Sequence, residues 1–179
     1  MMTETTTASS YEELNDIQRK LLQNIGENPG IRYRELLRLT HLANGVLTYH
    51  LSLLQKLDQV KVERNKSKMT RYYTNNISTV ETGVIGYIRN HPTRQIILLL
   101  LERDLCSFDD IVEHTRKAPS TISWHLKRLK EAGIISVQYG RYQSYKVTNK
   151  EVVAEVMYRY RQSFIDKVVD NYTEIMDEL

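Results

Sequence analysis

One segment of the chain, residues 119–132, combines small hydroxyl side chains at its beginning with basic side chains further along. At helical spacing, Ile122, Leu126 and Leu129 fall on one face, which we expect to be buried. Hydroxyls and amides at the start of such a helix can contact base edges or phosphates in a major groove, and lysine and arginine neutralise phosphates. The segment therefore predicts a helix that contacts double-stranded DNA through side chains outside the apolar face: Ser120, Thr121, Ser123, Trp124, Lys127 and Arg128.

A short loop of residues 140–142 lies between two stretches in which polar and apolar residues alternate. Such alternation predicts two strands joined as a hairpin. Arg141 then lies at the tip of the hairpin, where its guanidinium can reach an adjacent minor groove or the phosphate backbone. We expect Arg141 to be a further DNA contact.

The chain contains an internal repeat. Shifted by 75 positions, residues 31–62 align with residues 106–137 without a gap. Six positions are identical, including the histidine pair His50 and His125, and most of the others are similar in character. Tyr72 matches Tyr145 at a shift of 73, so one loop is two residues longer in the first copy. The shared order of elements indicates two copies of one fold.

Each copy reads as two helices, a turn, a third helix and a hairpin, which is typical of a winged helix-turn-helix domain. A capping box at Ser10 predicts the start of the first helix, and Gly133 suits the position after the third helix of the second copy. The expected segments are 14–25, 33–39, 44–57, 60–64 and 71–74 in the first copy and 93–102, 108–115, 119–132, 134–139 and 143–148 in the second.

The first copy has a less charged third helix but a more basic hairpin loop. On its helix, the positions expected to face DNA are Gly45, Thr48, Tyr49 and Ser52. On its hairpin, we expect phosphate contacts from Lys66, Lys68 and Arg71. Two interpretations remain open at this point. The first copy is either a weaker DNA reader or, since Leu53 is expected to be exposed, a docking surface for protein.

Two further helices are predicted outside the repeats. Residues 80–90 read as a linker helix that ends at His91-Pro92. Residues 150–179 contain no glycine or proline and carry an apolar stripe, which predicts one long amphipathic helix. The stripe is too long for one small domain to cover, so we expect this helix to form a homodimer through Met157, Tyr160, Phe164, Val168, Tyr172 and Ile175.

The composition is that of a globular protein with an unequal charge distribution. The net charge of the 179 residues is +3, but residues 1–16 carry −4 and residues 150–179 carry −3, which leaves +10 on residues 17–149. A basic body suggests an anionic partner. With one cysteine, no transmembrane run and no signal-like start, we expect a reducing, cytoplasmic compartment.

The second copy resembles the winged-helix domains of the ArsR family through residues 91–99, residues 120–135 and Gly140-Arg141 with Tyr145. The first copy resembles winged helices that are common in archaeal regulators through residues 28–30 and 48–51. The resemblance covers residues 14–149. It implies a transcription regulator, usually a homodimer, that binds double-stranded DNA.

The same resemblance argues against a metal site. Metal-sensing members of the family carry a Cys-x-Cys pair at the second helix, where this chain has Cys106 and Phe108. Another common site uses acids and histidines on the last helix, and residues 150–179 contain no histidine. We expect no metal and no cofactor.

Taken together, the sequence predicts a mainly helical chain with small hairpins. Its parts are a disordered start (1–10), a first winged-helix domain (11–78), a linker helix (79–91), a second, ArsR-like domain (92–149) and a dimerisation helix (150–179). We expect sequence-specific DNA binding in transcription control and no enzyme, because no nucleophile–base pair or phosphate-binding glycine loop is visible. The alternative is a winged-helix adaptor that binds other proteins in a nucleic-acid assembly.

Overall fold

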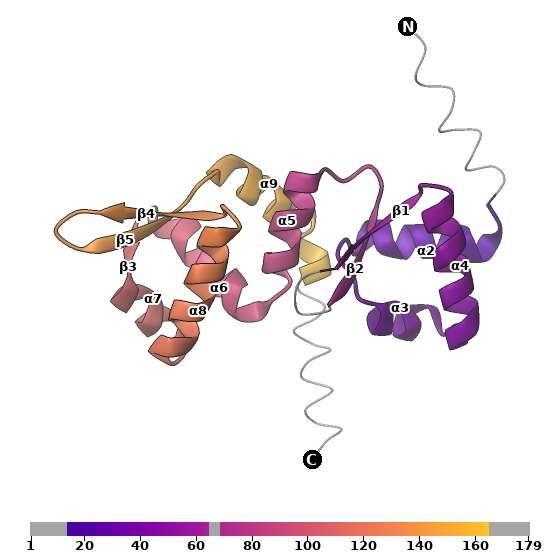
Figure 1. Ribbon diagram of the computed structural model, residues 1–179, viewed down its shortest axis with the longest axis horizontal. Coiled ribbons are helices and arrows are strands. Elements are labelled where there is room, and N and C mark those ends of the chain that lie inside the picture. The colour runs from indigo at the N-terminus through magenta and orange to yellow at the C-terminus, as the bar shows by residue number, and fades with distance from the viewer. Residues whose placement is uncertain (1–13, 65–68, 165–179) are drawn as a thin grey trace, which may run out of the picture. The chain divides into compact units, whose positions relative to one another are not determined.

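The computed structural model describes residues 14–64 and 69–164 (Figure 1). The chain divides into two compact units, one ending at Ser78 and the other beginning at Thr79. Each is mainly helical and carries a small antiparallel sheet, as the sequence predicts. Residues 1–10, which were expected to be disordered, lie outside the described residues.

The first unit contains three helices followed by a hairpin: α2 (Asp16–Glu27), α3 (Tyr33–Thr40), α4 (Asn44–Lys56), β1 (Val60–Arg64) and β2 (Thr70–Thr74). The capping box predicted at Ser10 lies outside the described residues, and α2 begins only at Asp16. The Asn15 side chain accepts a hydrogen bond from the Gln18 amide, and the Gln18 side chain accepts one from the Asn15 amide, both at 2.9 Å. This reciprocal pair satisfies two amides at the helix start.

One face of each helix forms the core of the first unit. Leu21 and Ile25 of α2, Leu36 of α3, and Leu47 and Leu54 of α4 are completely buried. The two strands pair antiparallel and cover this core on one side. The apolar spacing of the sequence therefore identifies the buried faces correctly.

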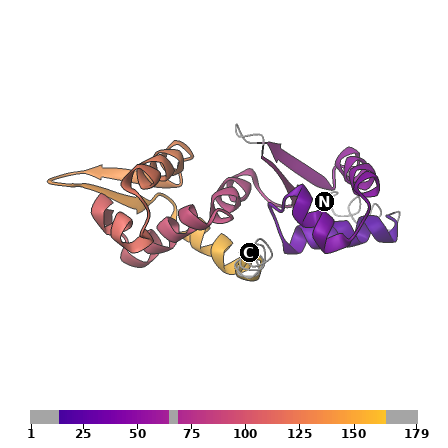
Figure 2. The same ribbon diagram turned by 90° about the horizontal axis from the view of Figure 1, so that it is seen from below.

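The second unit has the same three helices and hairpin, with an additional helix at each end. Its elements are α5 (Thr79–Ile88), α6 (His91–Arg103), β3 (Cys106–Ser107), α7 (Phe108–Thr115), α8 (Pro119–Glu131), β4 (Ile135–Tyr139), β5 (Gln143–Val147) and α9 (Lys150–Arg159). The sheet order is β3-β5-β4, and Figure 2 shows the β4–β5 hairpin projecting beyond the helices of its own unit. The two-residue strand β3 was not predicted, because two residues carry no alternation.

The structure confirms the internal repeat in detail. Helices α4 and α8 begin 75 residues apart, as do β1 and β4, whereas β2 and β5 begin 73 residues apart. Thr40 and Thr115 are both buried and donate a hydrogen bond of 2.7 Å to the carbonyl four residues earlier. His41 and Arg116 both adopt the left-handed conformation directly after the second helix. Gly133 also has a positive φ of 71° at the end of α8, as predicted.

The flanking helices differ from the predictions in two respects. The helix predicted as a linker is α5, which packs against α6 and α9 inside the second unit. The long helix predicted over residues 150–179 is not continuous, because α9 ends at Arg159 with Tyr160 as its C-cap. Phe164, expected at a dimer contact, is only 4% exposed and lies close to Arg89, which follows α5. Val168, Tyr172 and Ile175 lie outside the described residues.

In the part of the chain that the structure describes, none of the helices has both the length and the apolar character that crossing a membrane requires.

Candidate nucleic-acid interface

Helix α8 presents the face that the sequence predicts. Ile122, Leu126 and Leu129 are between 0 and 3% exposed and hold the helix against the core of the second unit. The side chain of Trp124 is 53% exposed. The other exposed residues on the outward face, in order along the helix, are Ser120, Thr121, Ser123, Lys127 and Glu131.

The first turn of α8 differs from that of most other helices in its capping. Helices α2, α6 and α7 have Asn15, Asn90 and Ser107 as N-caps, and each side chain accepts a bond from a backbone amide. In α8 and its repeat α4 the N-cap is alanine, at positions 118 and 43, which supplies no acceptor. The amides of the first turn are therefore left for water or for a ligand. Together with the helix dipole, such amides attract phosphate.

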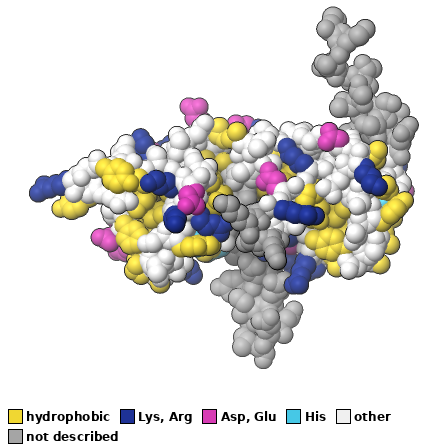
Figure 3. Space-filling model, viewed as in Figure 1, with side chains coloured by type: hydrophobic (Ala, Val, Ile, Leu, Met, Phe, Trp, Pro, Cys, Tyr) yellow, Lys and Arg dark blue, Asp and Glu magenta, His cyan; other side chains and the backbone are white. Residues whose placement is uncertain are grey.

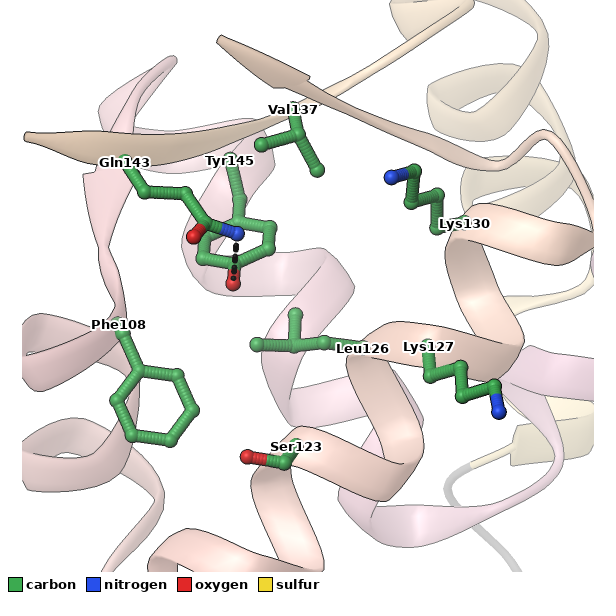
Figure 4. Close-up of a pocket in the computed structure, with 8 residues that line it drawn as sticks. All are labelled: Phe108, Ser123, Leu126, Lys127, Lys130, Val137, Gln143 and Tyr145. Atoms are coloured by element: carbon green, nitrogen blue, oxygen red, sulfur yellow. Dashed lines mark hydrogen bonds between the residues drawn. The ribbon is translucent and has the colours of Figure 1, made fainter. Parts of the chain in front are cut away.

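A cavity of about 440 Å³ separates α8 from the β4–β5 hairpin (Figure 4). Its walls combine aromatic and aliphatic groups with two hydroxyls, an amide and the ammonium group of Lys130, whereas the ammonium group of Lys127 points away from the cavity. Gln143 donates a hydrogen bond of 2.8 Å to the Tyr145 hydroxyl across one wall. Lys130 extends from α8 toward the hairpin and is not among the DNA contacts that the sequence predicts. The lining residues are Phe108, Ser123, Leu126, Lys127, Lys130, Val137, Gln143 and Tyr145.

The tip of the β4–β5 hairpin is basic and aromatic. Arg141 is exposed, and the flanking Tyr139 and Tyr142 are 76% and 74% exposed. Figure 3 shows a basic side chain at the end of this hairpin. The turn predicted over residues 140–142 thus places a guanidinium where it can reach beyond the protein surface.

The corresponding face of α4 in the first unit is exposed but poorer in charge. Gly45, Thr48, Tyr49 and Ser52 all lie on the surface, and Tyr49 is 61% exposed. The Thr48 hydroxyl is already engaged: it donates to the Asn44 carbonyl at 3.0 Å and lies 2.8 Å from a tyrosine hydroxyl of α3. A DNA contact by Thr48 would have to share this hydroxyl.

Arg71 does not lie where the sequence predicts. Its side chain is only 7% exposed, and its Nη1 donates to the Gly30 carbonyl at 2.8 Å. Burial lowers the pKa of its guanidinium. Arg71 therefore joins β2 to the loop before α3, and its guanidinium lacks the exposure that the predicted phosphate contact requires. Lys66 and Lys68 of the same loop lie outside the described residues.

The paired histidines are buried beside the two exposed aromatic rings. His50 lies edge-on to Tyr49 with ring centroids 5.1 Å apart, and His125 lies edge-on to Trp124 at 4.8 Å. The sequence predicts framework histidines with hydrogen bonds. The structure places both in the framework, but Nδ1 of His50 is buried with no hydrogen-bond partner among the described residues. Burial, followed by the charge of Arg128, lowers the pKa of His125.

Two family models match the chain. One, described as "Bacterial regulatory protein, arsR family", matches residues 91–137, and another, described as an N-terminal HTH domain, matches residues 15–85. The first covers α6, α7, α8 and the start of β4, and the second covers all elements of the first unit. The match of two helix-turn-helix models in tandem agrees with the repeat seen in the structure.

A curated relative comes from Methanocaldococcus jannaschii and is named "Uncharacterized HTH-type transcriptional regulator MJ1398". It is 26% identical over 122 residues, which is 68% of this chain and 30% of that protein. The chain thus spans less than a third of the length of this relative.

Two solved structures match parts of the chain. HlyU from Vibrio cholerae is 20% identical, with a TM-score of 0.41 over 46% of this chain and 90% of that one. A complex of Lactococcus lactis ZitR with DNA is 17% identical, with a TM-score of 0.35 over 77% of this chain and 84% of that one.

Proposed function

We propose that this chain, which carries two helix-turn-helix domains of which the second matches the ArsR regulatory family, is a transcription regulator that binds double-stranded DNA. The observation that carries the proposal is the outward face of α8. An apolar stripe fixes this helix to its unit, while its free first-turn amides, hydroxyls, indole and lysine all face outward. These are the groups that contact phosphates and base edges in a major groove.

The cavity beside α8 suits the sugar–phosphate backbone at the edge of that groove. Lys130 would neutralise a phosphate there, Lys127 would neutralise one on the outward side of α8, and Phe108 with Tyr145 would pack against deoxyribose. Beyond the cavity, Arg141 at the hairpin tip would reach the neighbouring minor groove. The proposed site therefore consists of a helix in the major groove, phosphate contacts at the cavity beside it and an arginine at the tip of the hairpin that lines this cavity.

The experiment that tests this function is selection of bound sites from a pool of random duplexes by the purified full-length chain. We expect enrichment of a defined sequence, and an affinity that falls steeply as the salt concentration rises, since phosphate contacts release counterions. Failure to enrich any sequence, with no binding to duplex DNA at low salt, would overturn the proposal.

A second copy of the chain is the partner that fits this function best. Two-fold symmetry would place two α8 helices on successive major grooves of a near-palindromic site. Exposed apolar side chains remain on the flanking helices, since Val80 of α5 is 64% exposed and Tyr158 of α9 is 71% exposed. Met157 and Tyr160, predicted at this contact, are half-buried. We place the dimer contact on this part of α5 and α9.

The first unit has a second candidate function, as a docking surface for protein. Its α4 face carries Lys56 as its one lysine, whereas Val46, Tyr49 and Leu57 are 38%, 61% and 53% exposed. Substituting both Lys66 and Lys68 by alanine separates the two functions. A lower affinity for random duplex DNA with a weaker salt dependence favours DNA binding by this unit, and an unchanged salt dependence favours docking.

A further inference from the structure

Arg128 lies in a different environment from Lys127 and Lys130, the two nearby lysines of α8. Its side chain is half-buried, with the guanidinium carbon 4.6 Å from the ring centroid of Trp124 and 5.8 Å from that of Tyr87 on α5. The Tyr87 hydroxyl also donates to the Arg128 carbonyl at 3.3 Å. Guanidinium groups stack on aromatic faces because they are planar, weakly hydrated and attracted by the ring electrons. Arg128 thus bridges two rings that belong to different helices.

The internal repeat indicates that this position serves packing. Leu53 occupies the equivalent position on α4, 75 residues earlier, and is half-buried as well. A leucine there cannot contact phosphate, so the position does not require a charge. What both residues share is a place beside the aromatic residue four positions earlier, Tyr49 in α4 and Trp124 in α8.

We propose that Arg128 is a positioning residue that fixes the orientation of the Trp124 indole on the reading face of α8. Tyr87 supports it from α5, and Lys127 supplies the phosphate contact that the sequence assigns to both basic residues. The consequence is that the specificity of the site depends on α5, a helix that lies outside the helix-turn-helix motif. The orientation of the indole is a property of the free protein. Only the DNA part of the test rests on the proposed function.

Trp124 is the single tryptophan of the chain, so its fluorescence reports directly on this contact. Excitation at the long-wavelength end of the tryptophan absorption band does not excite the twelve tyrosines. We expect Arg128→Lys and Tyr87→Leu each to increase quenching of Trp124 by acrylamide and to lower its fluorescence anisotropy. Lys127→Met, one residue away and exposed, is the matched control and should leave both values unchanged. Circular dichroism of each variant verifies the fold.

Binding measurements separate positioning from phosphate contact, because lysine keeps the charge of arginine but not its planar stack. We expect Arg128→Lys to lower the preference for a selected duplex over a random one about two- to fivefold, the value of one exposed cation–π contact. Its salt dependence should stay that of the wild type. Lys127→Met should keep the preference but reduce the slope of log affinity against log salt by about one.

The proposal is overturned if Arg128→Lys retains both the wild-type quenching and the wild-type preference. It is also overturned if Arg128→Met lowers the salt slope by about one while Trp124 quenching stays unchanged, since Arg128 would then be a phosphate contact. If no variant, nor the wild type, binds duplex DNA, the proposed function fails. The fluorescence result on free protein still decides whether Arg128 positions the indole.

Discussion

Arg71 and Arg128 carry the same guanidinium as Arg141, but each is held by other parts of its own unit. Arg71 donates to a carbonyl 41 residues away, and Arg128 lies under a tyrosine that is also 41 residues away. Arg141 and Lys127 instead extend from the surface without such contacts among the described residues. Some of the arginines and lysines on α4, α8 and the two hairpins are therefore engaged within the protein and are not available to contact phosphate.

Substituting Arg71 by methionine should destabilise the first unit without reducing DNA affinity. The Gly30 carbonyl would lose its buried donor, which typically costs about 1–3 kcal/mol of the free energy of unfolding. Urea unfolding followed by circular dichroism measures the loss. The transition of the second unit, followed by Trp124 fluorescence, serves as the internal control and should not move. A stable first unit combined with weaker DNA binding would return Arg71 to the phosphate contacts.

His125 should make the stability of the second unit depend on pH. Its pKa is lowered in the folded state, first by burial and then by Arg128. Below the unfolded-state pKa of about 6.5, the unfolded chain binds more protons than the folded one, so the free energy of unfolding falls as pH falls. Above that value the contribution is fully present. His125→Asn should flatten this dependence between the folded and unfolded pKa values, whereas the exposed His114→Asn should retain it.

Spacing alone predicts which residues of α8 are buried and which are exposed, because every third or fourth residue meets the same core. It cannot tell an exposed arginine from a stacked or buried one. That distinction depends on a ring or a carbonyl supplied by a distant segment. Lys130 was missed for the same reason, since the cavity it lines forms only when the hairpin folds back beside α8.

Helices α4 and α8, the third helix of each repeat, have alanine as their N-cap residue. Helices α2, α6 and α7 have asparagine or serine there, and its side chain accepts a hydrogen bond from a first-turn amide. A side-chain cap stabilises a helix, so its absence in both repeats costs stability at the same place. This loss of helix stability is explained if the uncapped amides bind phosphate. We therefore expect the start of α8 to contribute to DNA binding rather than to stability.

Substituting Ala118 by serine should therefore have opposite effects on stability and on DNA binding. The serine hydroxyl would accept a bond from a first-turn amide and raise the free energy of unfolding by about 0.5–2 kcal/mol. The same bond would withdraw that amide from phosphate and weaken duplex binding. Thermal unfolding and titration with a fluorescent duplex measure both effects. A stabilised variant with undiminished affinity would show that the amides do not contact DNA.

At the level of elements, the three helices and hairpin of each unit could be predicted because amphipathic spacing and turn residues mark them locally. Three features could not be predicted in this way: the capping box of α2, the strand β3 and the end of α9. A strand of two residues exists only through its pairing with Tyr145 and Ser144. Likewise, α9 ends at Arg159 although the apolar stripe continues past Tyr160, and residues 161–164 form a separate helical turn.

Across the whole molecule, a basic body of +10 carries two helix-turn-helix units, and acidic residues gather toward both ends. The sequence predicts the tandem arrangement correctly because the repeat is visible without a structure. The sequence does not predict to which unit α5 belongs, because a helix between two domains has the same amphipathic pattern whether it links them or packs against one of them. Its packing on α9 and α6 makes the flanking helices part of the second unit.

The full-length chain should be a dimer at micromolar concentration by light scattering. Val80→Glu and Tyr158→Glu should each shift it toward the monomer, because a carboxylate in an apolar contact must be desolvated. Both side chains are exposed within one chain, so neither change disturbs the fold. Leu39→Glu, at a 47% exposed position of α3 in the first unit, is the control. A wild-type monomer at this concentration would exclude the dimer.

The central claim is that α8 of the second unit contacts the phosphates of double-stranded DNA. The most direct measurement is the affinity of Lys127→Ala for one duplex over a range of salt concentrations, compared with Lys20→Ala on the exposed side of α2. We expect Lys127→Ala to bind more weakly, with a slope of log affinity against log salt that is smaller by about one, and Lys20→Ala to behave as the wild type. Equal slopes and affinities for all three proteins would contradict it.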